Sequence, residues 1–360
     1  MTQAAWQDSV LSSLSRVGQR QGLDALAERF EDLVRWLGDD FAAFEHTLAG
    51  LLTEAQDETS PVQVRSIAEQ AARYLLALPG KRIRPLCVML ASKLGDESDP
   101  DQVRDVAIAC ELVHVATLLH DDVIDEGTDR RGVPAARVVY GNSAAILGGD
   151  HLLILALQRT RRVGNPRLID GLLETIAAMV EAEAIQLERR GLFEPSRDAY
   201  MAVIRGKTAA LFRWGLAAGG ILAGLDRSQV EALEHVGVAL GMAFQLADDL
   251  LDLRGDPAIT GKNTLADLRE GKMTWPLLVA CEKEPALTAR LREMVSVPAN
   301  DGNDPAQLIT AVEATGAIEA TRAFALEQRD RAQRALDELP PTTARQALVW
   351  VTRFAAERAH

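Results

Sequence analysis

Hydrophobic residues recur at a helical period along nearly the whole chain, and no alternation of period two persists for more than a few residues. The pattern breaks where Pro, Gly, Asn and Asp cluster. The clearest breaks are residues 57–62, 78–81, 93–101, 161–167, 253–263 and 297–306. The stretches between them are long enough for helices of about three to six turns. The pattern therefore predicts an all-α fold.

Two segments, residues 105–125 and 230–253, are apolar around most of the helix circumference. Helices of this kind need neighbours on most sides, so both are expected at the centre of the fold. The first 60 residues differ, because their apolar positions, from Leu23 to Leu48, follow one face and the segment carries no motif. We expect an N-terminal helical extension at 1–60, packed on one all-α domain at 61–360.

Composition narrows the class of protein. Hydrophobic residues make up 48% and charged residues 25%, which excludes a disordered chain, and the aromatic content of 4% favours helices over sheets. The net charge of −13 argues against nucleic acid as a partner. Cys87, Cys110 and Cys281 lie in apolar helical stretches and are expected to be free thiols of a reducing compartment. Because neither a signal peptide nor a membrane span is predicted, we expect a cytoplasmic protein.

Two Asp-rich motifs close the two apolar segments. They contain Asp121, Asp122 and Asp125 in the first (LLHDDVIDEG), and Asp248, Asp249 and Asp252 in the second (FQLADDLLDLRG). In each motif the first and last Asp are four residues apart and lie on one helix face. Such carboxylates repel one another unless the helix end is solvated or a divalent cation binds there. Carboxylate oxygens with no cysteine among them are ligands that suit Mg²⁺. A solvated polar helix end would explain a single motif without any metal, but two matching motifs favour metal binding.

Other polar residues extend the same helix faces. His114 precedes Asp121 by seven residues and therefore lies two turns away on nearly the same face. Glu111 lies about one turn before His114. On the other segment, Gln245 precedes Asp248 by three residues. A single His on an apolar helix is more often a core residue, and only its alignment with the Asp motif favours a role at the site.

Basic residues cluster where loops meet the two Asp-bearing segments. They are Lys81, Arg82, Arg84, Arg130, Arg131, Lys207, Lys262 and Lys272, and Thr208 follows Lys207 at the start of an apolar helix. One of them alone would be a solvated surface charge, whereas several beside Asp motifs favour a site for phosphorylated anions. A nucleotide-binding P-loop is excluded because the chain has no GxxxxGK[ST] motif.

The motif series resembles the trans-isoprenyl diphosphate synthases (polyprenyl synthetases). From about residue 75 to 285 the matching elements, in family order, are GKRIRP, ELVHVATLLHDDVIDEGTDRRG, GNSAAILGGDHLL, GKTAALF, GMAFQLADDLLDLRGD and GKNTLADLREGKMTWPLL. The resemblance implies one large helical bundle around a central cavity, the isoprenoid synthase fold, and a homodimer. Residues 181–187 depart slightly from a Gly-containing family segment, and we expect a packing difference there.

The resemblance also implies a reaction, in which Mg²⁺ assists ionisation of an allylic diphosphate and isopentenyl diphosphate attacks the allylic cation. Asp121, Asp125 and Asp248 are implied to hold three Mg²⁺ ions on the allylic diphosphate, with Asp122, Asp249 and Asp252 as direct or water-mediated partners. The residues implied to contact the allylic diphosphate are Arg130, Lys207, Lys262 and Lys272, and those implied for isopentenyl diphosphate are Lys81, Arg84, His114 and Arg131. Carbonyl oxygens near Thr208 and Gln245 would stabilise the cation.

Product length should depend on the residues beneath the first motif. Ala116 and Thr117 lie ~6–8 Å from Asp121 along the helix, and both are small. In the family a bulky residue there stops growth early, so the resemblance implies a long product, hexaprenyl to decaprenyl, which would be delivered to a membrane. Gly237 and Gly241 either leave further room or mark close helix packing, and we favour packing.

Two other interpretations stay open. A class I terpene cyclase or a head-to-head synthase shares the fold and the Asp motifs but needs no isopentenyl site. The residues suited to such a site argue against both alternatives; they are Lys81, Arg84, His114 and Arg131. A non-catalytic regulatory subunit of a heteromeric synthase would tend to lose motif aspartates, and all six are present here.

Overall fold

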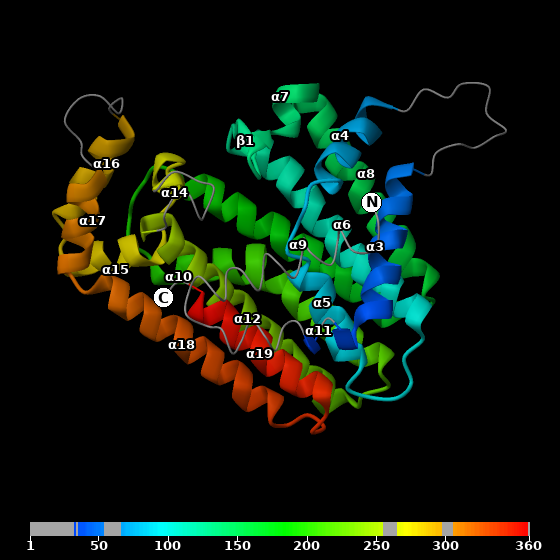
Figure 1. Cartoon of the computed structure of the whole chain (residues 1–360). Coiled ribbons are helices and arrows are strands. Elements are labelled where there is room, and N and C mark those ends of the chain that lie inside the picture. The colour runs from blue at the N-terminus through cyan, green and yellow to red at the C-terminus, as the bar shows by residue number, and fades with distance from the viewer. Residues whose placement is uncertain (1–31, 34, 54–65, 255–264, 297–304, 359–360) are drawn as a thin grey trace. The chain divides into compact units, whose positions relative to one another are not determined.

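The computed structural model describes residues 32–33, 35–53, 66–254, 265–296 and 305–358. Nearly all of these residues lie in helices, with one pair of two-residue strands among them, so the expected all-α fold is confirmed (Figure 1). They form two compact units. The first unit contains the described residues up to 172 together with 215–230 and 340–350, and the second contains 173–214, 231–339 and those from 351 onward.

The first unit is built around one central helix. Its elements are α3 (Gly38–Thr53), α4 (Ile67–Leu76), α5 (Ile83–Ser92), α6 (Pro100–Ile124), β1 (Asp129–Arg130), β2 (Val133–Pro134), α7 (Ala136–Tyr140) and α8 (Asn142–Arg162). Helix α6 packs against α3, α4, α5, α7 and α8. The central position expected for residues 105–125 is therefore confirmed.

Local sequence fixes both ends of α6. At the start, the carboxylate of Asp99 accepts a hydrogen bond from the backbone N–H of Asp101 at 2.8 Å, and Pro100 occupies the first turn, where its missing N–H costs nothing. At the other end, the backbone N–H of Asp125 donates to the carbonyl of Asp121 at 2.8 Å. The first Asp motif thus occupies the last turn of α6, and the β1–β2 hairpin follows directly.

Four helices have residues in both units, and the remaining elements belong to the second unit alone. The four are α9 (Pro166–Arg189), α11 (Ala210–Leu222), α12 (Arg227–Arg254) and α19 (Thr343–Glu357). The others are α10 (Arg197–Ile204), the π-helical turn η1 (Arg205–Ala209), α14 (Ala266–Arg269), α15 (Trp275–Lys283), α16 (Leu287–Ser296), α17 (Pro305–Ala314) and α18 (Ala317–Leu336). In the second unit's core the centroid of the Trp275 ring lies 5.0 Å from that of the Tyr200 ring and 4.9 Å from that of the Phe324 ring.

Two glycines let α12 approach the chain around η1 closely. A β-carbon at Gly241 would lie 2.4 Å from the Cα of Ala209, and one at Gly237 would lie 2.5 Å from the Cα of Arg213. Backbone atoms occupy the space beside both glycines, so a larger residue would force the helices apart. The close-packing interpretation of this pair is confirmed, and the glycines provide no extra room.

Helix α3 is the part of the predicted N-terminal extension that the structure describes in detail. It packs on α4 and α6, and its side chains Phe41, Phe44 and Leu48 are buried. The boundary expected at residue 60 lies outside the described residues, so the division into 1–60 and 61–360 stays a prediction. In the described ranges we find no helix with the length and hydrophobicity needed to cross a membrane.

Candidate active site

Both Asp motifs lie at the carboxyl ends of their helices, the first on α6 and the second on α12. A helix dipole is negative at this end, so acidic side chains there are unfavourable unless a cation lies nearby. The first motif belongs to the first unit and the second motif to the second unit. Cation binding is expected at both helix ends.

Asp122 is the buried member of the first motif, only 1% exposed. Its Oδ1 accepts hydrogen bonds from Nε of Arg130, at 2.9 Å, and from Nη2 of the same guanidinium. Its Oδ2 is buried and has no hydrogen-bond partner among the described residues. Asp121 and Asp125 are half-buried. A buried carboxylate oxygen without a partner is costly, and a divalent cation would satisfy it.

His114 lies on α6 among arginine side chains. Burial, followed by the positive charges of Arg84, Arg131, Arg82 and Arg130, holds the pKa of His114 well below its usual value. The imidazole is therefore neutral at pH 7. The structure thus brings together His114, Arg84 and Arg131, three of the residues predicted for isopentenyl diphosphate. Such a concentration of positive charge suits a diphosphate group.

The turn before α5 carries the fourth of these residues. Lys81 is exposed, and Arg84 follows in the first turn of the helix. Arg131 lies against the same turn, because its Nη1 donates a hydrogen bond to the carbonyl of Leu78 at 3.2 Å. A β-carbon at Gly80 would lie 3.2 Å from that nitrogen, so Gly80 allows the close approach of Arg131.

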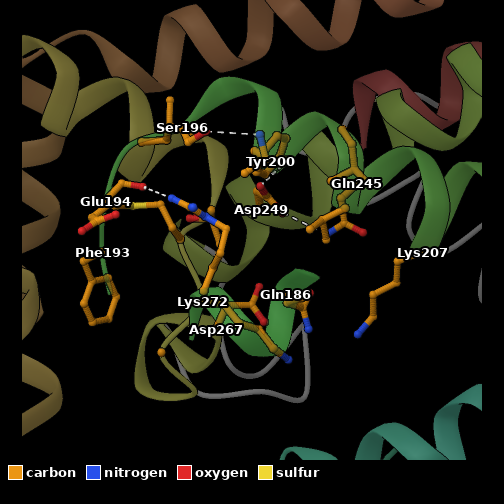
Figure 2. A pocket seen from close by; sticks show the side chains of 18 of the residues that line it. Gln186, Phe193, Glu194, Ser196, Tyr200, Lys207, Gln245, Asp249, Asp267 and Lys272 are labelled. Carbon is orange, nitrogen blue, oxygen red and sulfur yellow. Dashed lines mark hydrogen bonds between the residues drawn. The ribbon is translucent and has the colours of Figure 1, made fainter. Parts of the chain in front are cut away.

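Asp249 is the buried member of the second motif, 2% exposed, and is held by three donors. They are the hydroxyl of Tyr200 at 2.7 Å, the side-chain amide of Gln245 at 2.9 Å and the backbone N–H of Trp275 at 2.8 Å. Figure 2 shows Tyr200, Asp249 and Gln245 in this arrangement. Burial raises the pKa of Asp249 to about 7, although the three hydrogen bonds act in the opposite direction. The hydroxyl of Thr208 extends the network by donating to Gln245 Oε1 at 2.8 Å.

The other two aspartates of the second motif have different partners. Asp252 Oδ1 accepts hydrogen bonds from the backbone N–H groups of Ala266, at 2.9 Å, and Asp267, at 3.3 Å. Burial and then the charge of Asp267 raise the pKa of Asp252 to about 7. The side chain of Asp248 is 43% exposed and forms an ion pair with Arg358. Carboxyl groups that retain protons up to neutral pH are stabilised in their ionised form by a bound cation.

Lys207 and Thr208 lie in the π-helical turn η1, where the sequence pattern predicts the start of an apolar α-helix. The turn approaches α9 closely at Gly206, since a β-carbon there would lie 2.5 Å from the β-carbon of Ala182. Ala182 belongs to residues 181–187, where we expect a packing difference. Single π-helical turns are frequent at functional sites, because they redirect backbone carbonyls and side chains.

The lysines predicted for the allylic diphosphate already have carboxylate partners. Lys207 forms an ion pair with Glu183, and Lys272 Nζ lies 2.6 Å from a carboxylate oxygen of Glu270. A diphosphate that binds these lysines would share them with Glu183 and Glu270 or displace both carboxylates. Lys262, the other predicted lysine, lies outside the described residues.

One pocket of the second unit gathers most of these side chains (Figure 2). The pocket is partly open to solvent. Its lining includes Tyr200, Lys207, Thr208, Gln245, Asp249 and Lys272. The pocket therefore combines two lysines with carboxylate and amide groups, which suits a phosphorylated ligand that brings a metal ion with it.

Neither motif forms a complete metal cage by itself. Within the part of the chain that the structure describes, no three His, Cys, Asp or Glu side chains are grouped to hold a metal ion. Mg²⁺ usually keeps waters and takes oxygen ligands from substrate phosphates, with one or two protein carboxylates. The Asp122 oxygen, which has no hydrogen-bond partner in the described part of the chain, and the raised pKa values of Asp249 and Asp252 fit this mode of binding.

Tyr200, Glu183 and Arg358 lie outside every motif, yet the structure places them beside predicted site residues. Tyr200 precedes Lys207 by seven residues, and helical spacing would have linked the two. Glu183 lies in the segment noted only for its departure from the family pattern. Arg358 lies close to the C-terminus in a region without motifs, and no signal in the sequence connects it with Asp248.

Comparisons with known proteins agree with these features. The family model described as polyprenyl synthetase matches residues 65–313. The chain is 37% identical over 296 residues to the octaprenyl diphosphate synthase of Escherichia coli (strain K12), covering 81% of this chain and 90% of that protein. It is 36% identical over 321 residues to heptaprenyl diphosphate synthase component 2 of Geobacillus stearothermophilus, covering 88% and 95%.

Solved structures are also similar. A polyprenyl synthase from Caulobacter crescentus CB15, complexed with calcium and isoprenyl diphosphate, superposes with a TM-score of 0.82 at 34% identity, covering 91% of this chain and 97% of that one. A decaprenyl diphosphate synthase from Rhodobacter capsulatus gives a TM-score of 0.81 at 34% identity, covering 92% and 99%.

Proposed function

The chain belongs to the polyprenyl synthetase family and is a prenyltransferase, and we propose that it adds isopentenyl diphosphate head to tail to an allylic diphosphate. The resemblance predicted from the motif series is thereby confirmed. Similar proteins are named for octaprenyl and decaprenyl products, which supports a long-chain polyprenyl diphosphate as the product here.

We assign Mg²⁺ to the aspartates of both motifs, with three ions in all bound together with the allylic diphosphate. The carboxylates that would hold it are Asp121, Asp122, Asp125, Asp248, Asp249 and Asp252. When bound, Mg²⁺ would neutralise charge on the departing diphosphate. The partnerless Asp122 oxygen supports the assignment, as does the similar synthase that is complexed with calcium and isoprenyl diphosphate.

The cations of the chain would bind and orient the two substrates. Lys207, Lys272, Arg130 and Lys262 would hold the allylic diphosphate and stabilise its charge as the C–O bond breaks. Lys81, Arg84, His114 and Arg131 would hold isopentenyl diphosphate so that its double bond faces the allylic carbon. The arginines around neutral His114 support this second assignment.

The π-helical turn supports a role for the backbone near Thr208. Its altered hydrogen-bond ladder is where carbonyl oxygens could face the allylic cation, and the Thr208 hydroxyl fixes the Gln245 side chain by a 2.8 Å hydrogen bond. The departing diphosphate would accept the proton released when the new double bond forms. Exclusion of water by the bound substrates would protect the cation.

The alternative enzymes lack support from the first unit. A terpene cyclase or a head-to-head synthase needs no isopentenyl diphosphate site, whereas His114, one of the residues proposed for that site, lies among Arg84, Arg131 and two further arginines. A regulatory subunit is not favoured, since all six motif aspartates are present. One similar protein is named as component 2 of a heptaprenyl synthase, so a requirement for a second chain belongs in the test.

A homodimer in the cytoplasm is part of the proposal. On α9 the exposed side chains Leu173, Val180 and Leu187 are spaced by seven residues and form one apolar stripe, and Leu147 and Ile154 repeat the spacing on α8. Pairing with a second copy would cover such stripes. The three cysteines are buried and free, which supports a reducing compartment.

The observation that carries the proposal is the pocket in which Lys207, Lys272, Gln245 and Asp249 meet, in a chain of this family. The test is incubation of the purified protein with Mg²⁺, radiolabelled isopentenyl diphosphate and each short allylic primer, followed by mass spectrometry. We expect long-chain polyprenyl diphosphates from the protein alone. Cyclised products from the allylic substrate alone, or activity only with a second protein, would contradict it.

A matched pair of variants makes the assay specific. Asp121→Ala removes a proposed metal ligand from α6, and Asp101→Ala removes an exposed carboxylate from the first turn of the same helix. We expect the first variant to lose at least about a hundredfold in kcat/KM, which is the scale of lost electrostatic stabilisation. The second should retain wild-type turnover.

A further inference from the structure

Arg82 lies within the GKRIRP segment, between two residues proposed to bind isopentenyl diphosphate, but its side chain is buried. It is 8% exposed, whereas Lys81 is exposed and Arg84 is half-buried. Its Nε donates to a carboxylate oxygen of Glu45 at 3.2 Å, and its Nη1 donates to Glu111. Glu45 belongs to α3 and Glu111 to α6. One guanidinium therefore joins three separate segments of the first unit, an arrangement we call the Arg82 triad.

The backbone at Arg82 is as unusual as its side chain. Arg82 adopts the left-handed conformation, with φ 46° and ψ 30°, and is the N-cap of α5. A residue with a β-carbon rarely adopts this conformation, which persists only where its surroundings fix it. The two carboxylates fix it here. Because this residue sets the direction in which the chain enters α5, it also sets the positions of Lys81 and Arg84.

The Arg82 triad is adjacent to the proposed isopentenyl site. A β-carbon at Gly80 would lie 3.3 Å from Arg82 Nη1 and 3.2 Å from Arg131 Nη1, so both guanidinium groups lie over Gly80. Glu111 lies one turn before His114 on α6. The charge of Arg82 is also among those that lower the pKa of His114.

The carboxylates stabilise the charged form of Arg82 in its buried position. Burial alone would lower the pKa of Arg82, but the charges of Glu111 and Glu45 outweigh it and raise the pKa. Loss of one carboxylate would leave a buried cation with one partner and release one end of the guanidinium. The geometry of the turn thus depends on Glu45, a residue of the N-terminal extension.

We infer that Glu45 and Arg82 are positioning residues for the isopentenyl diphosphate site, an inference that rests on the proposed function. Glu45 anchors Arg82 from α3, and Arg82 fixes the turn that presents Lys81 and Arg84 to the diphosphate. Helix α3 then helps to position the residues that bind isopentenyl diphosphate, although it contains no motif.

The test separates the two substrates kinetically. We expect Glu45→Gln to raise the KM for isopentenyl diphosphate about tenfold, with the KM for the allylic diphosphate and kcat within about twofold of wild type. Arg82→Met should give a larger rise. Arg82→Lys keeps the charge but cannot bridge both carboxylates, so its KM should be intermediate. Calorimetric titration with isopentenyl diphosphate alone should show the same order of affinities.

A second ion pair of α3 supplies the control. Asp40 lies 2.5 Å from Lys93, away from the GKRIRP segment, and Asp40→Asn weakens the attachment of α3 without touching the Arg82 triad. We expect lower thermal stability and an unchanged KM for both substrates. If Glu45→Gln changes stability only, or raises both KM values equally, the positioning role is overturned. If the wild-type protein incorporates no isopentenyl diphosphate, the proposed function fails instead.

Discussion

The guanidinium of Arg358 lies 2.8 Å from a carboxylate oxygen of Asp248, the first aspartate of the second motif. The same guanidinium donates to the carbonyl of Phe244 at 2.6 Å and covers that residue's ring at 3.7 Å from its centroid. The Arg358 side chain is 3% exposed. Asp248 therefore has a buried cation of the protein beside it.

This ion pair predicts a stability effect that depends on the metal. Arg358→Gln should lower the free energy of unfolding by about 1–3 kcal/mol in the presence of a chelator, since it leaves Asp248 without its partner and removes the hydrogen bond to Phe244. With Mg²⁺ and inorganic pyrophosphate the loss should shrink, because the metal replaces the missing positive charge. Urea unfolding under both conditions measures the difference.

Another ion pair of the same C-terminal segment provides the control. The exposed Arg353 lies 3.5 Å from Glu357, which keeps Arg329 as a second partner, so Arg353→Gln should change stability by less than about 0.5 kcal/mol under either condition. An equal loss for Arg358→Gln with and without the metal and pyrophosphate would show that the pair with Asp248 is independent of metal binding.

The hydroxyl of Tyr200 predicts a second effect. Burial and the charge of Asp249 raise the pKa of Tyr200 well above its usual value, so the phenol stays protonated and remains a donor. At a pH of about 8, above the pKa of Asp249, Tyr200→Phe removes a 2.7 Å hydrogen bond to an ionised carboxylate and should cost about 1.5–3 kcal/mol of stability. The apparent affinity for Mg²⁺, measured from the metal dependence of turnover, should also fall.

Tyr74 offers a matched substitution. Its hydroxyl donates to the carbonyl of Pro134 at 2.8 Å in an exposed position of the first unit. Tyr74→Phe loses a neutral hydrogen bond that water can replace, so we expect less than about 1 kcal/mol and no change in metal dependence. If Tyr200→Phe behaves in the same way, the Tyr200 hydroxyl does not hold Asp249 in place.

The sequence alone predicts the helical class, the central position of α6 and the composition of the two motifs, because these depend on periodicity and local spacing. The close packing at Gly241 is also predictable, since two glycines one turn apart mark helices in contact. The π-helical turn at Lys207 is not, because the local pattern of η1 continues that of the helix after it. Its geometry depends on the contact between Gly206 and Ala182 of α9.

The partners of the charged residues are harder to predict, since they lie far apart in the chain. Arg82 resembles its neighbours in sequence and only the fold reveals that it faces Glu45 and Glu111. The same holds for Arg358 and Asp248. A sequence lists the charges around a site, but long-range packing decides which of them pair with each other and which remain available to a ligand.

Ala116 predicts control of chain length. The residue is fully buried in α6, about one turn and a half from Asp121. Ala116→Phe should shift the products toward shorter chains, if the growing chain passes this point, and should cost about 1–3 kcal/mol of stability from overpacking. Chromatography of products from one primer measures the shift, and unfolding measurements identify loss of folded protein.

Ala109 lies seven residues before Ala116 on the same face of α6 and is also buried. Ala109→Phe should strain the core to a similar degree but shorten the product less, because it lies two turns further from the first motif. Unchanged chain lengths from the Ala116→Phe variant would show that another residue limits product length.

His114 predicts proton uptake when isopentenyl diphosphate binds. Burial and the surrounding arginines depress the pKa of His114 in the free protein, and a bound diphosphate would offset those positive charges and raise the pKa. By linkage, the affinity should increase as pH falls from about 7 toward 6, and stability that is present above a pH of about 6.5 should be lost below it. Calorimetry in buffers of different ionisation enthalpy counts the protons taken up on binding. In the His114→Gln variant, which lacks the imidazole, the measured uptake should come only from protonation of the diphosphate itself. Equal uptake by wild type and His114→Gln would show that the imidazole does not sense the bound diphosphate.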